Sequence, residues 1–330
     1  MPSRSSIFSS RILGSALIWT VLSIILIEWL AQRALPAQHP SHEVDRLLFD
    51  LDHGRVPDGD TIFLGDSVGR QIAHALLRQS KGSFVPLASN AAIETPGQYY
   101  VLQRYLEHHP APRRVILMMG NPVEGQLHGN YTENYVQRGF LRWREMAELA
   151  WARKSLPFGL VMAGYRISPV FRYRLSLQKK IPLLETPNPY FGQFDMSTPS
   201  AAPPASTKHG ILAVIDAAWN HLRPGPTIAE IYFLRLAAFL EKRNIEWLYL
   251  PLPIPESAAR MLRPDEFYGR QIARVAGWSG QFPSMRAGAP PAMYPDDWFR
   301  DGSHFHDEPL ATVARDYARL LDSMGFGPNQ

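Results

Sequence analysis

The sequence contains no cysteine among its 330 residues. This absence excludes disulfides, thiolate zinc sites, a cysteine nucleophile and a lipid anchor on cysteine. Charged residues are also few, at 19%, whereas 45% of residues are hydrophobic, so the chain can bury a core and is not a disordered polymer. The histidines show no metal-ligand spacing with carboxylates, and neither a metal nor another cofactor is expected. The length suits one α/β domain with appendages, and the 29 prolines predict many irregular connections.

The first 35 residues predict a membrane anchor. Residues 12–27 carry no charge, and the apolar run continues past a single Glu28. About twenty helical residues at 1.5 Å each span about 30 Å, the thickness of the hydrocarbon core. Arg4 and Arg11 precede the run, so the positive-inside rule places the N-terminus in the cytoplasm. We expect a retained single-pass signal anchor in the inner (cytoplasmic) membrane with an extracytoplasmic, periplasmic domain. A cleaved signal peptide is the alternative.

The rest of the chain predicts a stalk over residues 36–58 and one domain over residues 59–330. Residues 36–58 are polar and hold three prolines around one short amphipathic stretch. After them, helical patterns alternate with short apolar runs that predict strands at 61–64, 84–88, 115–119 and 245–250. The last predicted helix covers about 309–324. This alternation predicts a parallel α/β sheet with right-handed crossovers, interrupted by an insertion at about 125–225 that is partly helical and partly irregular.

A Gly-Asp-Ser turn ends the first predicted strand. Gly65 permits a tight turn, and Ser67 would stand at the N-terminus of the next helix, at the carboxyl edge of the sheet where α/β folds bind ligands. The alternative is that Asp66 or Ser67 only caps the helix. The tripeptide by itself is a weak signal.

A serine nucleophile requires a base, and the base requires an orienting acid. Asp301 lies three residues before His304, just ahead of the last helix, so its carboxylate can reach Nδ1 of the imidazole and leave Nε2 for a serine. The same spacing at Asp50 and His53 falls in the predicted stalk, which favours a chance match. His306 lacks an acid at this spacing.

Together these residues resemble the SGNH (GDSL) hydrolase superfamily over about residues 60–325. The first family block corresponds to Gly65-Asp66-Ser67, and the last block, Asp-x-x-His, corresponds to Asp301 and His304. The resemblance implies a flavodoxin-like, three-layer fold. It also implies ester chemistry with Ser67 as nucleophile, His304 as base and Asp301 as its orienting acid.

The same resemblance implies an oxyanion hole, with departures from the family pattern. The donors would be the backbone of Ser67, the backbone of Ala92, where the family has glycine, and the side chain of Asn121. An N–H donor survives a glycine-to-alanine change if φ is negative. Asn121 lacks the usual spacing to glycine and the following aspartate, and a turn role at the strand end is the alternative. One such donor is worth about 3 kcal/mol of barrier.

An anchored SGNH-like domain resembles the extracytoplasmic proteins of alginate acetylation and teichoic-acid D-alanylation, which act beside a membrane-bound O-acyltransferase. The resemblance implies transfer of an acyl group, such as acetyl, to a cell-envelope or exported polysaccharide. Hydrolysis of an ester on that polysaccharide would use the same acyl-serine. The alternative class is a non-catalytic glycan-binding or assembly subunit of an acylation or secretion complex.

Positive charge is concentrated between Arg138 and Lys180. This segment holds ten Lys or Arg residues but only two Glu, a net charge of +8, whereas the whole chain carries +4. Interleaved aromatic residues suit an anionic lipid headgroup or an anionic glycan. No nucleic acid is expected, because the segment is predicted to lie outside the cytoplasm. An ordinary helical cap with a solvated basic face is the alternative.

Overall fold

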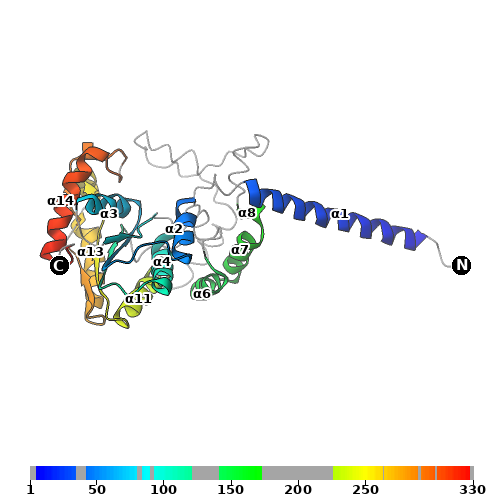
Figure 1. Ribbon diagram of the computed structural model, residues 1–330, viewed down its shortest axis with the longest axis horizontal. Coiled ribbons are helices and arrows are strands. Elements are labelled where there is room, and N and C mark those ends of the chain that lie inside the picture. Colours follow the sequence, from blue (N-terminus) through cyan, green and yellow to red (C-terminus); the bar gives the residue numbers. More distant parts are fainter. Residues whose placement is uncertain are drawn as a thin grey trace.

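The computed structural model describes residues 5–34, 42–79, 84–89, 93–120, 141–172, 226–262, 264–288, 291–301 and 303–327. A long helix, α1 (Ser5–Ala34), projects away from all the other elements (Figure 1). Those other elements form an α/β domain around a parallel sheet.

The main sheet has five strands, all parallel. They are β1 (Thr61–Gly65), β2 (Phe84–Pro86), β3 (Arg114–Met118), β4 (Glu246–Leu250) and β6 (Met285–Ala287). Their spatial order is β2-β1-β3-β4-β6, which, counted along the chain, is the 2-1-3-4-5 order of flavodoxin-like folds. The predicted parallel α/β sheet is confirmed, with β6 as a strand that the sequence did not indicate. A second sheet pairs β5 (Ile254–Pro255) with β7 (Met293–Tyr294).

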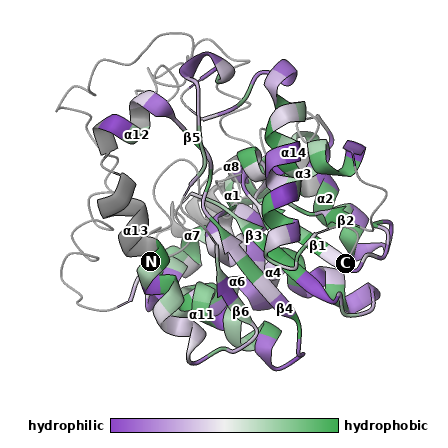
Figure 2. Cartoon of the chain, turned by 90° about the vertical axis from the view of Figure 1, so that its left-hand side faces the viewer, coloured by the Kyte–Doolittle hydropathy of each residue, from purple (hydrophilic) through white to green (hydrophobic). Residues whose placement is uncertain are grey.

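The strands are buried on both faces, and successive residues point into two different cores. Phe63, Ile116 and Leu248 face one core, together with α3 (Ser67–Gln79) and α14 (Asp307–Ser323). Leu64, Leu117 and Tyr249 face the other core, together with α4 (Glu94–His108) and α11 (Ile228–Glu241). Burial on both sides explains why these strands read as continuous apolar runs. Helix α14, in contrast, carries both hydrophobic and hydrophilic residues around its ribbon (Figure 2).

Part of the predicted stalk belongs to the domain. Residues 42–52 form a helix, α2, whose Val44, Leu48 and Leu51 are buried in the core shared with α4. The i, i+4, i+7 spacing of these residues gives the helix one apolar stripe. The domain therefore includes α2, rather than beginning at residue 59.

The described part of the insertion is helical and packs beside α4. It comprises α6 (Trp143–Arg153), α7 (Leu156–Ile167) and α8 (Pro169–Arg172). A buried ion pair joins α4 to α6, with Arg104 Nη2 2.6 Å from Glu145 Oε2. The hydroxyl of Tyr100 donates to the backbone carbonyl of Glu145 at 3.1 Å. These contacts fix the insertion to the side of the domain formed by α4 and α11. In the described ranges the remaining helices are α12 (Glu256–Leu262), α13 (Pro264–Ser279) and the 3₁₀ turn η6 (Asp296–Trp298).

Helix α1 contains one segment, Ser15–Arg33, that is long and apolar enough to cross a membrane or to serve as a signal sequence. Its side chains are almost entirely unburied. Near its end, Glu28 accepts hydrogen bonds from the hydroxyl of Ser168 and, at 2.8 Å, from the backbone N–H of Val170. Glu28 thus ties the end of α1 to α8, an interaction that the sequence did not suggest. The side of the membrane on which the domain lies stays a prediction.

Candidate active site

The turn that presents Ser67 requires glycine at its first position. Gly65 ends β1 with φ of +153°, and a Cβ placed there would lie 2.1 Å from the carbonyl oxygen of Met118 on β3. No side chain fits at that distance. Strand β3 therefore lies directly against the turn, and the backbone N–H of Asp66 donates to the same Met118 oxygen at 3.3 Å.

Asp66 caps α3. Its Oδ1 accepts from the backbone N–H groups of Val68 and Gly69, at 3.0 and 3.1 Å. Its Oδ2 lies 3.4 Å from the N–H of Gly120, which stands two residues after the end of β3 and precedes Asn121. Burial raises the pKa of the Asp66 carboxyl to about 6, although these N–H groups favour the ionised form. Of the two capping residues considered from the sequence, Asp66 caps the helix and leaves the Ser67 hydroxyl available.

Ser67, His304 and Asp301 form a continuous chain of hydrogen bonds. Ser67 Oγ lies 2.7 Å from His304 Nε2, and His304 Nδ1 lies 2.9 and 3.0 Å from the two oxygens of Asp301. The imidazole therefore has one nitrogen on the acid and the other on the serine, which is the arrangement of a nucleophile, a base and an orienting acid. The structure thus brings together all three residues that the sequence singled out.

Asp301 is held as an anion by several donors. Besides the imidazole, it accepts from the backbone N–H of His304 at 2.8 Å, and from the backbone and hydroxyl of Ser303 at 3.2 and 3.1 Å. Burial by itself would raise the pKa of Asp301, but these hydrogen bonds outweigh it and hold the pKa below its usual value. An ionised Asp301 is the form that orients an imidazole and stabilises an imidazolium.

The loop that carries His304 is closed on itself and clamped to α3. Phe299 and Phe305 form an isolated antiparallel bridge, and their rings stack with centroids 4.4 Å apart. The side-chain amide of Gln71 on α3 donates to the Phe305 carbonyl at 3.3 Å and accepts from the Phe305 N–H at 3.2 Å. Gln71 therefore links the helix that begins at Ser67 to the loop that carries His304.

A second glutamine holds the serine turn, a role that the sequence did not predict. Gln98 on α4 is fully buried. Its Oε1 accepts from the N–H of Gly65 at 3.1 Å, and its Nε2 donates to the carbonyl of Gly65 at 2.9 Å. A glutamine in a helical segment gives no signal of this role, because its partner lies 33 residues earlier in the chain.

Four other residues were considered from the sequence, two as oxyanion donors and two as competing histidines. Ala92 and Asn121 lie outside the described residues, so their roles as oxyanion donors stay predictions. His306 is exposed at the start of α14. His53 packs against the Phe49 ring in a tilted arrangement and contacts the Phe49 carbonyl with Nδ1 at 2.7 Å. Within the ranges described above, no three His, Asp or Glu side chains gather as metal ligands would.

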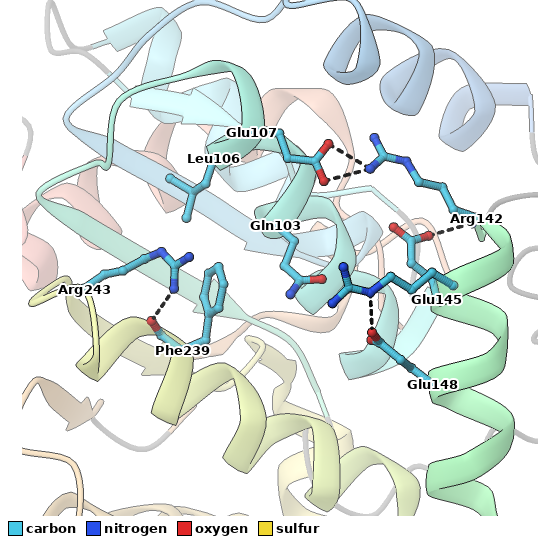
Figure 3. Close-up of a pocket in the computed structure, with 9 residues that line it drawn as sticks. Gln103, Leu106, Glu107, Arg142, Glu145, Glu148, Phe239 and Arg243 are labelled. Atoms are coloured by element: carbon cyan, nitrogen blue, oxygen red, sulfur yellow. Dashed lines mark hydrogen bonds and ion pairs between the residues drawn. The ribbon is translucent and has the colours of Figure 1, made fainter.

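A hollow lies between α4, α6 and α11 (Figure 3). Its charged lining pairs internally: Arg142 binds Glu107 at 2.7 Å, and Arg144 binds Glu148 at 2.9 Å. Arg142 Nη2 also meets Asp52 of α2. Arg142 thus joins the insertion to α2 and α4, whereas Arg144 pairs within α6 at the surface.

Comparison with known proteins gives little guidance. No family model matches the chain, and no curated protein matches it. Four solved chains match, among them one from Streptococcus pneumonia that its description assigns, provisionally, to platelet activating factor. That likeness covers 92% of this chain and 98% of the other, with 12% identity and a TM-score of 0.40. Similarity this low supports no functional statement.

Proposed function

We propose that the protein is a membrane-anchored, extracytoplasmic SGNH-type enzyme that forms an acyl-serine at Ser67. The observation that carries the proposal is the hydrogen-bonded chain from Ser67 through His304 to Asp301. A serine that only capped a helix would need neither the imidazole nor its acid. Asp66 provides the cap, so the Ser67 hydroxyl has no competing structural task there.

In the proposed first step, Ser67 Oγ attacks the carbonyl carbon of an ester. The hydroxyl proton passes to His304 Nε2, and Asp301 stabilises the resulting imidazolium. As the tetrahedral intermediate collapses, the ester C–O bond breaks and His304 returns the proton to the leaving alkoxide. Ser67 then carries the acyl group.

The second step repeats the chemistry with a new nucleophile. His304 removes a proton from an acceptor hydroxyl, whose oxygen attacks the acyl carbon. The bond to Ser67 Oγ breaks, and the serine recovers its proton. We propose a hydroxyl of a cell-envelope or exported polysaccharide as acceptor, on the basis of the anchored arrangement, with a membrane-bound O-acyltransferase as partner. Water as acceptor would give hydrolysis of an ester on the same polymer.

The oxyanion would be stabilised by backbone and side-chain donors at the carboxyl edge of the sheet. The N–H of Ser67 is the first amide of α3, and such amides have no intrahelical acceptor. Ala92 and Asn121 are proposed as further donors. Support for Asn121 comes from its chain neighbour Gly120, whose N–H faces Asp66 beside the serine turn.

The full chain in detergent, treated with 4-nitrophenyl acetate, tests the proposal. We expect a burst of nitrophenolate and a single acetyl group on Ser67 by mass spectrometry. Ser67→Ala should abolish the acetyl group, and His304→Ala should nearly do so, because an unactivated serine is a poor nucleophile at pH 7. Ser323→Ala, at the exposed end of α14, is the matched control and should behave as the parent. An acetyl group that persists in Ser67→Ala would overturn the proposal.

Two further measurements address the finer parts of the proposal. Adding polysaccharide to the acetylated enzyme should move the label to the polymer if the protein is a transferase, and release acetate if it is an esterase. A reporter active only in the cytoplasm, fused after Gln330, should be silent because the domain is proposed to lie outside. A strong reporter signal would contradict the orientation without affecting the acyl-serine.

A further inference from the structure

Helix α7 is apolar on two opposite sides. Phe158, Met162 and Tyr165 are buried against the domain. On the other side, Leu156 and Leu160 are 75% and 64% exposed. Their stripe continues to Ile167, which is 71% exposed. Ile167 lies eleven residues beyond Leu156 and therefore at nearly the same angle around the helix. A helix that is apolar all round is normally covered on every side. At twelve residues, α7 is about 18 Å long and too short to cross a membrane.

The exposed side of α7 continues onto α6. Trp151, near the end of α6, is 84% exposed. It lines, together with Leu156, an apolar depression between the two helices whose other walls are Ala147, Ala150, Lys154, Ser155 and Gly159. We call Trp151, Leu156, Leu160 and Ile167 the apolar ridge. Contiguous exposed apolar surface of this kind marks an interaction site, and tryptophan is enriched where protein meets the lipid headgroups.

The apolar ridge lies next to the helix that is able to cross a membrane. Helix α8 follows α7 after a single residue, Ser168, and α8 packs on the end of α1. Glu28 of α1 binds both the Ser168 hydroxyl and the Val170 N–H, which fixes that junction. Figure 1 shows α6 and α7 on the side of the domain from which α1 projects, whereas α3 and α14 lie on the far side.

We propose that the apolar ridge inserts into the lipid interface beside α1 and seats the domain on the membrane surface. The inference rests on the proposed membrane anchoring of α1. Lipid is favoured as the occupant because the ridge is continuous, through α8, with the point where α1 leaves the domain. Contact through apolar side chains also fits the engagement of Arg142 in ion pairs with Asp52 and Glu107 of the domain. The contact should therefore change little with salt, unlike attraction between exposed charges.

The absence of cysteine allows the contact to be mapped on the full chain. Single-cysteine variants Leu160→Cys, Leu77→Cys and Leu22→Cys are labelled with an environment-sensitive fluorophore and reconstituted in phosphatidylcholine–phosphatidylglycerol vesicles. Leu77 is the matched control, a partly exposed leucine on α3, far from α1. Leu22 reports on the middle of the apolar segment of α1. Lipids carry a spin-label quencher either near the headgroup or deep in the acyl chain, and iodide is the aqueous quencher.

We expect the label at position 160 to lose most of its fluorescence to the shallow lipid quencher and to resist iodide, at low and at high salt. The label at position 77 should show the opposite behaviour, and the label at position 22 should respond to the deep quencher. Equal iodide quenching at 160 and 77, with lipid quenching at 22, would refute insertion of the apolar ridge into lipid and leave the membrane anchoring of α1 unaffected. If neither lipid quencher affects the label at 22, both the membrane anchoring of α1 and the insertion of the apolar ridge are refuted.

Protection of position 160 from iodide without lipid quenching would indicate a protein occupant, such as a second copy of the chain, and would also overturn the proposal. Unfolding temperatures of the labelled variants check the fold. If Leu160→Cys does not fold, Ile167→Cys probes the same ridge and has the same expected result.

Discussion

Gln98 offers a direct test of how the serine turn is held. Its side-chain amide bridges the N–H and the carbonyl of Gly65 from α4, in a fully buried position. In Gln98→Ala, the Gly65 carbonyl still accepts from the N–H of Ser89 at 3.0 Å. The Gly65 N–H, however, loses its acceptor, Oε1 of Gln98. The turn that aims Ser67 would then be held from one side only.

The expected destabilisation has two parts. An unpaired buried N–H costs about 1–3 kcal/mol. Truncation of a buried side chain adds about 1–2 kcal/mol for the cavity that remains. A total of about 3 kcal/mol corresponds to a fall in Tm of about 6–12 °C for a domain of this size. Displacement of Ser67 by about 1 Å would also slow acylation by about 100-fold.

The assay compares thermal unfolding of the full chain in detergent with the rate of the nitrophenolate burst. Gln103→Ala is the matched control, since Gln103 lies on the same helix, is only part-buried and donates to the Tyr99 hydroxyl. We expect it to change stability by less than about 1 kcal/mol. If Gln98→Ala lowers Tm no more than Gln103→Ala, or if it lowers Tm without slowing the burst, Gln98 does not position the turn.

Replacement by glutamate refines this test through pH. Burial raises the pKa of a carboxyl, so Gln98→Glu would be neutral at low pH and would retain one donor and one acceptor for Gly65. Because the folded-state pKa is raised, the variant should lose stability as pH rises above about 4.3, the value in the unfolded chain, until it passes the folded-state pKa. If the variant's destabilisation relative to the parent is the same at pH 4 and pH 8, the proposed geometry is excluded.

Three further predictions concern the same site. Gly65→Ala should prevent folding or cost about 3 kcal/mol or more in thermal unfolding, because its Cβ would overlap the Met118 carbonyl; a stable, active variant would contradict the geometry of the turn. Asp301→Asn should slow the burst about 10³–10⁴-fold, less than the loss of His304 or Ser67, through lost imidazole orientation; an unchanged rate would remove Asp301 from the mechanism. Burial raises the pKa of Asp66 from 3.8 to about 6, so the folded state binds more protons than the unfolded state between these values, and stability should fall by up to about 3 kcal/mol as pH rises from 4 to 6. Unfolding across this range should show that fall in the parent, and a similar fall in Asp66→Asn would show that another group causes it.

Local sequence predicted the parts of the fold that depend on neighbouring residues. Strands β1, β3 and β4 are buried on both faces, and such strands have continuous apolar sequences. They can therefore be predicted without a structure. Strand β6 was not predicted, because its three residues, Met285, Arg286 and Ala287, are too few and too mixed in polarity to form a pattern. It is a strand because β4 offers an unpaired edge beside it. The stripe of α2 was visible as an amphipathic stretch, but only packing on α4 makes it part of the domain.

The candidate site divides in the same way. Gly65-Asp66-Ser67 and Asp301-x-x-His304 are short-range patterns whose chemistry follows from residue type and spacing, so the sequence by itself determined which three side chains should meet. Only the tertiary structure decided what holds them. Gln71 clamps the His304 loop, Gln98 brackets the serine turn and Glu28 joins α1 to α8. Each of these side chains acts on a backbone group that the chain brings close only by folding, from 33 to 234 residues away. A polar side chain with a distant backbone partner leaves no periodicity or motif, and its role becomes visible only when the two segments lie side by side.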